Sequence, residues 1–280
     1  MFDLSGKVAL ITGAARGQGR AHALKLAAAG ADVVAIDVCA QIGSVDFPMS
    51  TPEDLEETRR LVESLGRRAV AEVGDVRDLA RLEQIVATAV DELGSIDIVV
   101  ANAGISSYAK TWELTPEQWQ DMIDVNLTGV WNTLRATVPQ MRAQRSGGSI
   151  IITSSTAAVK AIPNASHYSA AKAGIVALAK SLAQELGPEF IRVNTIHPTG
   201  VDTQMIHNEG TYRRFMPDRD DVSKDDVAPK FAALNVLPVP WMQPSEVSDS
   251  VLFLASDASK YITGSMLMID AGATAKYPGS

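Results

Sequence analysis

The chain has 280 residues, of which 46% are hydrophobic and 21% are charged, and its formal net charge is −8. This is the composition of an ordinary globular protein with enough length to bury one large core. The negative charge disfavours nucleic-acid binding, because such a surface repels phosphate backbones, and no apolar run approaches the ~18 residues of a membrane span.

Strand-like and helix-like segments alternate along almost the whole chain. The predicted strands are short apolar runs at residues 7–12, 32–36, 68–73, 96–101, 149–153, 191–196 and 266–269. The predicted helices cover residues 19–29, 78–93, 166–186 and 245–255, and two more begin at Thr51 and Thr115, where a threonine cap precedes a proline. Continuously apolar strands indicate burial on both faces. We therefore predict a single α/β domain over residues 1–280: a Rossmann-like, doubly wound, seven-stranded parallel sheet with helices on both faces.

Residues 198–243 interrupt this alternation. The segment is long, rich in proline and mixed in character. Because a loop of this length in a compact domain is usually functional, we expect it to form the substrate-binding region.

A glycine-rich turn follows the first strand and opens the first helix. Its glycines have the spacing GxxxGxG, with an arginine and a glutamine between them. Glycines allow a tight turn and close approach of a pyrophosphate, and a helix N-terminus offers free N–H donors. The predicted phosphate-binding residues are Gly13, Arg16, Gly17, Gln18 and Gly19. Turn chemistry without a ligand is the alternative explanation.

The ends of the following strands supply the remaining predicted cofactor contacts. Asp37 ends the second strand, 18 residues after Gly19, where an acid can accept hydrogen bonds from the hydroxyls of an adenosine ribose. A solvated acid at a strand end is the alternative. Further contacts are predicted at Val38, Asp75, Val76, Asn102, Ala103 and Gly104.

Two residues disagree about the cofactor. Arg16 stands where a cation can approach the 2′-phosphate of NADP, whereas the carboxylate of Asp37 would repel it. At ~4 Å and an effective dielectric constant of ~20, a contact between two like unit charges costs about 4 kcal/mol. We therefore predict NAD, with Arg16 either paired to Asp37 or left in solvent.

The loop from Cys39 to Ser50 is longer than the two to six residues that typically connect a strand to a helix. It follows Asp37 directly and so lies beside the expected adenosine. We predict that this loop is a flap over bound NAD and that it slows cofactor exchange.

Ser155, Tyr168 and Lys172 form the candidate catalytic group. Tyr168 and Lys172 are four residues apart, so they share one face of the predicted helix. A tyrosine pKa of ~10 is too high for efficient proton exchange at neutral pH, and a neighbouring ammonium group would lower it. Ser155 follows the fifth predicted strand and can hold the substrate oxygen.

These motifs together resemble the short-chain dehydrogenase/reductase family over nearly the whole chain. The matching segments are TGAARGQG, NAG at 102–104, DVNLTGVWN, YSAAK at 168–172 and IRVNTIHPTGVDT at 191–203. The resemblance implies that Tyr168 is the general acid/base and that Lys172 lowers its pKa and binds the nicotinamide ribose. It further implies that Ser155 polarises the substrate oxygen and that Asn126 orders a water for proton relay. The implied cofactor contacts include Pro198, Val201 and Thr203, the last two beside the carboxamide.

Three positions depart from the family pattern. Ala101 replaces the first asparagine of the usual NNAG, and Gln18 replaces a common isoleucine. Thr199 follows Pro198 where glycine is usual, with the glycine displaced to Gly200, so the resemblance does not fix the path of this loop. None of these changes touches the four catalytic positions.

Longer segments resemble a narrower subgroup, the actinobacterial carveol-dehydrogenase-like enzymes associated with mycofactocin. They include GAARGQGRAHA, WQDMIDVNLTGVWNT and NVLPVPWMQPSEVSDSVLFLASDASKYITG. The resemblance implies NAD-linked oxidation of a hydrophobic secondary alcohol, a tightly held NAD, an external redox carrier and a homotetramer. A carbonyl reductase working in the opposite direction and a non-catalytic nucleotide sensor are the alternatives.

The remaining candidates have simpler interpretations. The four histidines, His22, His167, His197 and His207, show no metal-ligand spacing. Cys39, the only cysteine, cannot form an internal disulfide, so we expect it to pack near the adenosine and expect the protein to be cytoplasmic. His197 either lines the cleft or is a satisfied strand-end histidine, and Trp241 either caps the substrate pocket or packs within its loop. We predict that Tyr212 and Phe215 form an apolar wall for the substrate.

Overall fold

The computed structural model describes residues 2–277. Within this range, seven parallel strands form one sheet in the order β3-β2-β1-β4-β5-β6-β7. The strand order reverses between β1 and β4, which pair directly, with Leu10 opposite Val99. At such a switch point the loops that leave the two strands diverge and open a crevice at the carboxyl ends of the strands. This confirms the predicted doubly wound fold.

The strands are β1 Val8–Thr12, β2 Asp32–Asp37, β3 Ala69–Val73, β4 Ile98–Ala101, β5 Gly148–Thr153, β6 Ile191–Pro198 and β7 Met266–Ile269. The α-helices are α1 Gly17–Ala28, α2 Pro52–Ser64, α3 Leu79–Leu93, α4 Pro116–Ile123, α5 Gly129–Gln144, α6 Ser166–Leu186, α7 Glu209–Phe215, α8 Lys224–Ala232 and α9 Pro244–Ala255. A π-helical turn, Asp124–Thr128, joins α4 to α5, and 3₁₀ turns lie at Thr156–Ala158, Gly187–Glu189 and Asp257–Ser259.

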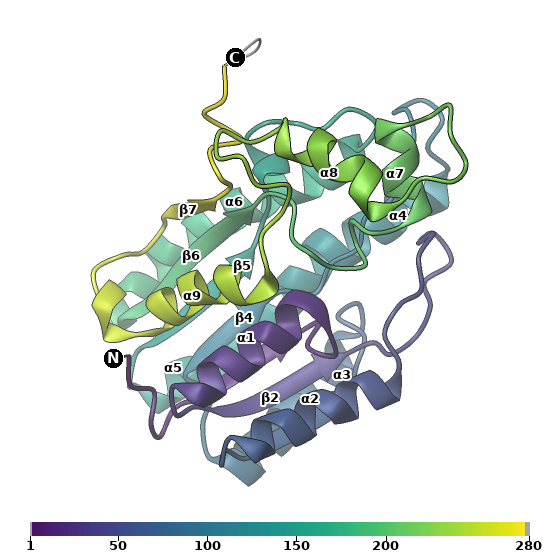
Figure 1. Cartoon of the computed structure of the whole chain (residues 1–280). Helices are drawn as coiled ribbons and strands as arrows, with labels where there is room; N and C mark the ends of the chain where they lie inside the picture. Colours follow the sequence, from purple (N-terminus) through teal and green to yellow (C-terminus); the bar gives the residue numbers. More distant parts are fainter. Residues whose placement is uncertain (1, 278–280) are drawn as a thin grey trace.

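Helices cover both faces of the sheet (Figure 1). Apolar side chains of α1, α2 and α9 pack on one face, and those of α3, α5 and α6 pack on the other. The central strands β1 and β4 are therefore buried along their whole length. This two-sided burial is the reason for their continuously apolar sequences.

The edge strands depart from the predicted two-sided burial. In β3 the burial is only partial, and Val73 is 47% exposed. The residues of β7 are all half-buried. Each of these strands has a single neighbour in the sheet, so helices cover it less completely.

Capping fixes where two helices begin. Thr51 accepts a hydrogen bond from the backbone of Asp54, and Thr115 accepts one from the backbone of Gln118, each within a reciprocal capping box. Both starts agree with the sequence prediction. Each box satisfies two backbone donors that the first helical turn would otherwise leave unpaired.

The predicted loop 198–243 contains two helices. It leaves the sheet after β6 and returns to the same point, where Val201 pairs with Met242. Between these residues, α7 and α8 lie side by side (Figure 1). Their starts had local signals, since Asn208 caps α7 and Ser223 forms a capping box with Asp226.

Among residues 2–277, no helix is both long enough and apolar enough to cross a membrane.

Candidate active site

Two adjoining cavities open at the carboxyl ends of the strands. The larger has a volume of about 550 Å³ and lies between the glycine turn, the ends of β2 and β4, and the loop after β2. The smaller, of about 320 Å³, lies between the end of β5, α6 and the α7–α8 segment. We call them the cofactor cavity and the substrate cavity. They share five lining residues: Gln18, Asn102, Gly104, Thr203 and Met205.

The glycine turn shapes one wall of the cofactor cavity, and its glycines are required by space. A Cβ atom on Gly19 would lie 1.9 Å from the carbonyl oxygen of Gly13, and one on Gly13 would lie 2.9 Å from the Cα atom of Ala103. Gly13 also has a positive φ of 68°. The first turn of α1 has no side-chain cap, so its N–H donors stay available for an anion.

Gln18 and the end of β4 complete this wall. The side-chain oxygen of Gln18 is buried and has no hydrogen-bond partner among the described residues. Thr12 Oγ1 accepts hydrogen bonds from the backbone N–H groups of Asn102 and Ala103, both at 3.1 Å. Gln18 as a residue lines both cavities and so lies where they meet.

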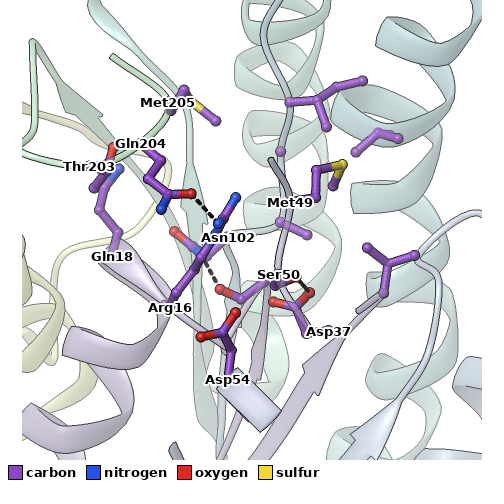
Figure 2. A pocket seen from close by; sticks show the side chains of 18 of the residues that line it. Arg16, Gln18, Asp37, Met49, Ser50, Asp54, Asn102, Thr203, Gln204 and Met205 are labelled. Atoms are coloured by element: carbon purple, nitrogen blue, oxygen red, sulfur yellow. Dashed lines mark hydrogen bonds between the residues drawn. The ribbon is translucent and has the colours of Figure 1, made fainter. Parts of the chain in front are cut away.

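Asp37 ends β2 and lines the cofactor cavity as predicted. Its carboxylate accepts hydrogen bonds from the backbone of Ala15 at 2.9 Å, the hydroxyl of Ser50 at 2.5 Å and the backbone of Cys39 at 3.3 Å. A carboxylate has about four lone-pair sites. One site is therefore still free to accept a ribose hydroxyl, and Figure 2 shows Asp37 beside Ser50 at the base of the cavity.

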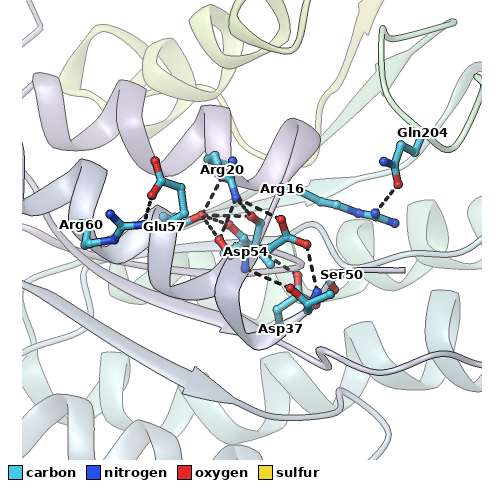
Figure 3. A network of polar contacts seen from close by, with 12 residues as sticks. Arg16, Arg20, Asp37, Ser50, Asp54, Glu57, Arg60 and Gln204 are labelled. Atoms are coloured by element: carbon cyan, nitrogen blue, oxygen red, sulfur yellow. Dashed lines mark hydrogen bonds and ion pairs between the residues drawn. The ribbon is translucent and has the colours of Figure 1, made fainter. Parts of the chain in front are cut away.

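The structure contradicts both predicted positions of Arg16. Its guanidinium group does not form a hydrogen bond with Asp37, and it does not extend freely into solvent. It donates to the side-chain oxygen of Gln204 (Figures 2 and 3). It also donates to the carbonyl oxygen of Pro48 at 2.5 Å. Hydrogen bonds from the backbone and from Ser50 already engage the Asp37 carboxylate. Arg16 instead reaches across the cavity to two loops.

The other predicted cofactor residues lie around the same space. Val38, Asp75 and Val76 line the cofactor cavity, and Asp75 also forms an ion pair with Arg77 at 2.7 Å. Ala103 lines the cofactor cavity, Pro198 and Val201 line the substrate cavity, and Thr203 lines both. The structure therefore brings together all the residues predicted from strand ends and glycine spacing.

The four candidate catalytic residues all line the substrate cavity. Ser155 follows β5, where its side chain caps a 3₁₀ turn by accepting from the backbone of Ala157. Tyr168 and Lys172 stand one turn apart on α6, with the Lys172 ammonium 5.6 Å from the centre of the tyrosine ring. That ammonium donates to the carbonyl oxygen of Thr153 at 2.8 Å.

The pKa values of Tyr168 and Lys172 differ from the expectation. Burial raises the pKa of Tyr168 to about 12, and its hydrogen bond with Ser155 opposes this shift only partly. Burial also lowers the pKa of Lys172 to about 8. The expected net shift of the Tyr168 pKa to a lower value is therefore not found in this structure, because the loss of water around the phenolate dominates.

Asn126 lies in the π-helical turn between α4 and α5 and is fully buried. Its side-chain oxygen accepts from the backbone N–H of Ile105 at 3.2 Å, and its amide donates to the Ile105 carbonyl at 3.1 Å. These two bonds fix the chain just after β4, beside Gly104. The side chain is thus directed at backbone groups.

His197 proves to be a satisfied strand-end histidine. It lines neither cavity, and burial lowers its pKa, so the ring is neutral. Its Nδ1 donates to the Ser155 carbonyl at 2.9 Å, and its Nε2 accepts from the hydroxyl of Thr195 at 2.8 Å. Because a carbonyl can only accept, these partners fix the tautomer. His197 therefore holds the backbone of Ser155 in place.

Two predictions about the aromatic residues of the α7–α8 segment are resolved by the packing. Phe215 lines the substrate cavity, but Tyr212 does not, since its hydroxyl bonds to His207 Nδ1 at 3.0 Å. Trp241 packs against His207 and Phe231, with ring centres 4.7 and 5.8 Å apart, and lines neither cavity.

The single cysteine is a packing residue in this structure. Cys39 packs against the core that contains α1 and α2, and its φ is +48°. Burial and nearby carboxylates raise the pKa of its thiol to about 12, so the reactive thiolate is scarce at neutral pH. Within residues 2–277, no group of three or more histidine, cysteine, aspartate and glutamate side chains is placed to hold a metal ion.

The residues of the substrate cavity that were not singled out from the sequence include Tyr108, Arg214 and Phe231. They come from the loop after β4 and from α7 and α8. No local motif marks them, because only the packing of distant segments brings them to the cavity.

Comparison with known proteins agrees with this geometry. The family described as enoyl-(acyl carrier protein) reductase matches residues 13–274. A putative short-chain type dehydrogenase/reductase of Mycolicibacterium smegmatis is 52% identical over 275 residues, which cover 98% of this chain and 99% of that protein. The (−)-trans-carveol dehydrogenase of Rhodococcus erythropolis is 49% identical over 277 residues, which cover 99% and 100%.

A solved structure extends the agreement to three dimensions. The carveol dehydrogenase of Mycobacterium avium, crystallised in complex with NAD, superposes with a TM-score of 0.97 at 50% identity, covering 99% of this chain and 100% of that one. Family match, relatives and fold agree with the motifs of the sequence: this chain belongs to the short-chain dehydrogenase/reductase family.

Proposed function

We propose that this protein is an NAD-dependent dehydrogenase that interconverts a hydrophobic secondary alcohol and its ketone by hydride transfer, with Tyr168 as the general acid/base. One observation carries the proposal: Ser155, Tyr168 and Lys172 line one cavity, and that cavity joins a second one with the features of a dinucleotide site. Carveol dehydrogenases are among the similar proteins, which supports an alcohol as the substrate.

The cofactor cavity fits NAD. The glycine turn leaves room for a pyrophosphate, Gln18 lines the cavity, and Asp37 keeps one lone-pair site for a ribose hydroxyl. The same carboxylate opposes a 2′-phosphate, and Arg16, the one cation placed to offset it, is engaged with Gln204 and Pro48. We expect turnover with NADH to exceed turnover with NADPH, and the reverse preference would refute this assignment.

The catalytic residues have distinct tasks. NAD, when bound, supplies the nicotinamide that accepts or returns the hydride. Tyr168 takes the hydroxyl proton of the alcohol, and Ser155 holds the same oxygen through its hydroxyl. Lys172 places a positive charge beside the tyrosine ring, and Asn126 holds the backbone of Ile105 that follows the end of β4.

The central test is Tyr168→Phe. Removing a general acid/base typically costs about 10²–10⁴-fold in rate. We expect a loss in this range for alcohol oxidation, while NAD binding stays within a few-fold, because the phenol hydroxyl acts on the substrate. Calorimetric titration with NAD supplies the binding control. A fully active variant would contradict the mechanism, and a wild-type protein that binds NAD but oxidises no alcohol would favour the nucleotide-sensor alternative.

The proposal includes the physiological setting. The enzyme acts in the oxidising direction in the cytoplasm as a homotetramer, and an external redox carrier reoxidises its cofactor. Assays in both directions separate it from a carbonyl reductase: oxidation should proceed with an artificial electron acceptor without added NAD. Light scattering of the purified protein tests the assembly.

Retention of NAD is supported by the position of Arg16. Its guanidinium links Gln204, in the segment after β6, to Pro48, in the loop after β2. Figure 3 shows the contact with Gln204. Both segments line the cofactor cavity, so we infer that this bridge slows the departure of a dinucleotide.

Substitution of the bridge tests retention. Arg16→Ala and Gln204→Ala should each speed NAD release, as should shortening the loop 39–50. Mass spectrometry of the purified and then denatured protein gives the NAD content, and a dilution assay gives the release rate. Unchanged release in all three variants would show that the loop is not a flap.

A further inference from the structure

The side chains that line the substrate cavity carry positive charge, whereas the chain as a whole is acidic. The whole chain carries 33 acidic and 25 basic side chains, excluding histidine. Among the described residues that line the substrate cavity there is no aspartate or glutamate, but there are three cations: Lys160, Lys172 and Arg214. Lys172 belongs to the catalytic group, so two cations have no assigned task.

Arg214 is the better placed of these two. It is half-buried near the end of α7, and its guanidinium lies 4.2 Å from the centre of the Tyr108 ring. Within residues 2–277 it forms no ion pair and no hydrogen bond to another residue. Stacking uses the flat face of a guanidinium and leaves its N–H edges free. Arg214 therefore presents unused donors at the cavity wall.

Two acids of this region are occupied elsewhere. Glu209, on the same helix, forms an ion pair with Arg213, and Asp202 binds Lys224 at 2.8 Å. Arg213 is exposed and lines a different surface hollow. Two adjacent arginines on α7 thus differ: one has a carboxylate partner at the surface, and the other faces the substrate cavity without one.

Lys160, an exposed residue after the 3₁₀ turn that follows β5, lines the same cavity. Its ammonium group donates to the carbonyl oxygen of Ala273 at 3.3 Å and has no carboxylate partner in the described chain. An ammonium has three donors, so two stay available. Apolar side chains, including Ile162, Phe215 and Phe231, fill the space around these two cations.

We propose that Arg214 and Lys160 form an anion subsite in the substrate cavity, so that the physiological substrate is a secondary alcohol or ketone that also bears a carboxylate. This inference rests on the proposed function and narrows its substrate class. A carboxylate would accept charge-assisted, bidentate hydrogen bonds from the guanidinium edge. A fully apolar substrate would bury that edge without replacing the water it loses.

A purely structural explanation of Arg214 exists. A cation near a helix C-terminus is favourable, and so is stacking on Tyr108. Neither effect depends on the substrate, so neither changes the preference between a charged substrate and its uncharged ester. Substrate discrimination therefore separates the two explanations.

The experiment compares hydroxy acids with their methyl esters, from 3-hydroxybutyrate to 9-hydroxydecanoate, with the hydroxyl on the carbon before the terminal methyl. Turnover is followed with NAD⁺ and with dichlorophenolindophenol as acceptor. Because a hydrogen bond to a charged group contributes about 10- to 100-fold in binding, we expect the acid to exceed its ester in kcat/KM by about tenfold or more at the chain length that spans the cavity.

Variants locate this preference. Arg214→Gln should lower the acid-to-ester ratio about tenfold, Arg214→Lys should lower it less, and Lys160→Gln should add to either effect. Arg213→Gln is the matched control and should leave the ratio unchanged. Thermal unfolding confirms that each variant is folded. Esters equal to or better than acids at every length would overturn the proposal, as would an acid preference that persists in Arg214→Gln/Lys160→Gln.

A binding measurement distinguishes failure of the subsite from failure of the proposed function. Calorimetric titration with hexanoate needs no turnover. Hexanoate binding that is lost in Arg214→Gln, in a protein that oxidises no alcohol, would retain the anion subsite and refute the dehydrogenase. Ester oxidation that depends on Tyr168, without hexanoate binding, would retain the dehydrogenase and refute the subsite.

Discussion

The two cavities are built in different ways. The cofactor cavity has one wall of backbone, made of a glycine turn, the ends of parallel strands and a helix N-terminus, with Asp37 held by three hydrogen bonds. Side chains of the loop after β2 and of the segment after β6 line the rest. The substrate cavity has walls of side chains from α6, α7, α8 and the loop after β4. A backbone wall tolerates almost no change in shape, whereas a side-chain wall can be altered residue by residue. This contrast predicts how each cavity responds to substitution.

The largest effect should come from the backbone wall. In Gly19→Ala the new methyl group would lie 1.9 Å from the carbonyl oxygen of Gly13, a contact that only a movement of the turn can relieve. Because the same turn lines the cofactor cavity, we expect NAD affinity to fall at least about 100-fold, equivalent to about 2.7 kcal/mol. Fluorescence titration with NADH measures the affinity.

A matched control uses a glycine outside the site. A Cβ on Gly187, between α6 and β6, would meet no atom within 4 Å, and the residue has no positive φ. Gly187→Ala should therefore leave NAD affinity unchanged. If Gly19→Ala also bound NAD normally, the cofactor wall would be as adaptable as the substrate wall, and the contrast would be lost.

The contrast also explains which parts of the molecule were predictable. The glycine turn, Asp37 and the Tyr168–Lys172 pair are local patterns, in which a few adjacent residues meet the demands of one turn or one helix face. Phe215 and Arg214 reach the substrate cavity only because α7 packs beside α8, and no sequence period encodes that packing. The predicted contacts of Arg16 were wrong for the same reason, because its actual partners, Gln204 and Pro48, come from loops that are distant in the sequence.

The pKa of Tyr168 also depended on its surroundings. Spacing places a lysine beside the tyrosine but does not show how much water the fold removes from the phenol. In the structure the loss of water outweighs the hydrogen bond with Ser155 and raises the pKa of Tyr168 to about 12. Residue types therefore indicate the chemistry, while the packing sets its pH range.

A pH profile tests whether the titrating chemistry belongs to the substrate cavity. The base in alcohol oxidation is the deprotonated tyrosine, and its raised pKa leaves it mostly protonated at neutral pH. We expect kcat/KM for oxidation to rise with pH from about 7 upward, approaching tenfold per unit, and the reverse reaction to fall.

Two variants assign this profile. Lys172→Met should lower kcat/KM but keep the rise with pH, because Lys172, with a pKa of about 8, is already neutral in the range where Tyr168 titrates. Asp37→Asn alters only the cofactor cavity and should leave the midpoint unchanged. Oxidation that is independent of pH between 6 and 10, or a midpoint that follows Asp37, would show that the titrating group lies elsewhere.

The smallest effect should come from a single side chain of the substrate wall. Phe215 lines the substrate cavity and packs against Phe231 with ring centres 4.5 Å apart, whereas Tyr212, on the same helix, faces away and bonds to His207. In Phe215→Ala the wall recedes and loses apolar contact, so KM for a bulky neutral alcohol such as carveol should rise a few-fold, or about 1 kcal/mol. Tyr212→Ala should leave that KM unchanged and lower thermal stability instead, because it removes the hydroxyl bonded to His207. Steady-state kinetics and thermal unfolding on both variants measure the split. Equal effects of the two variants on KM would mean that α7 lines the cavity with a different face. They would also mean that side chains of the substrate wall do not act independently on substrate binding.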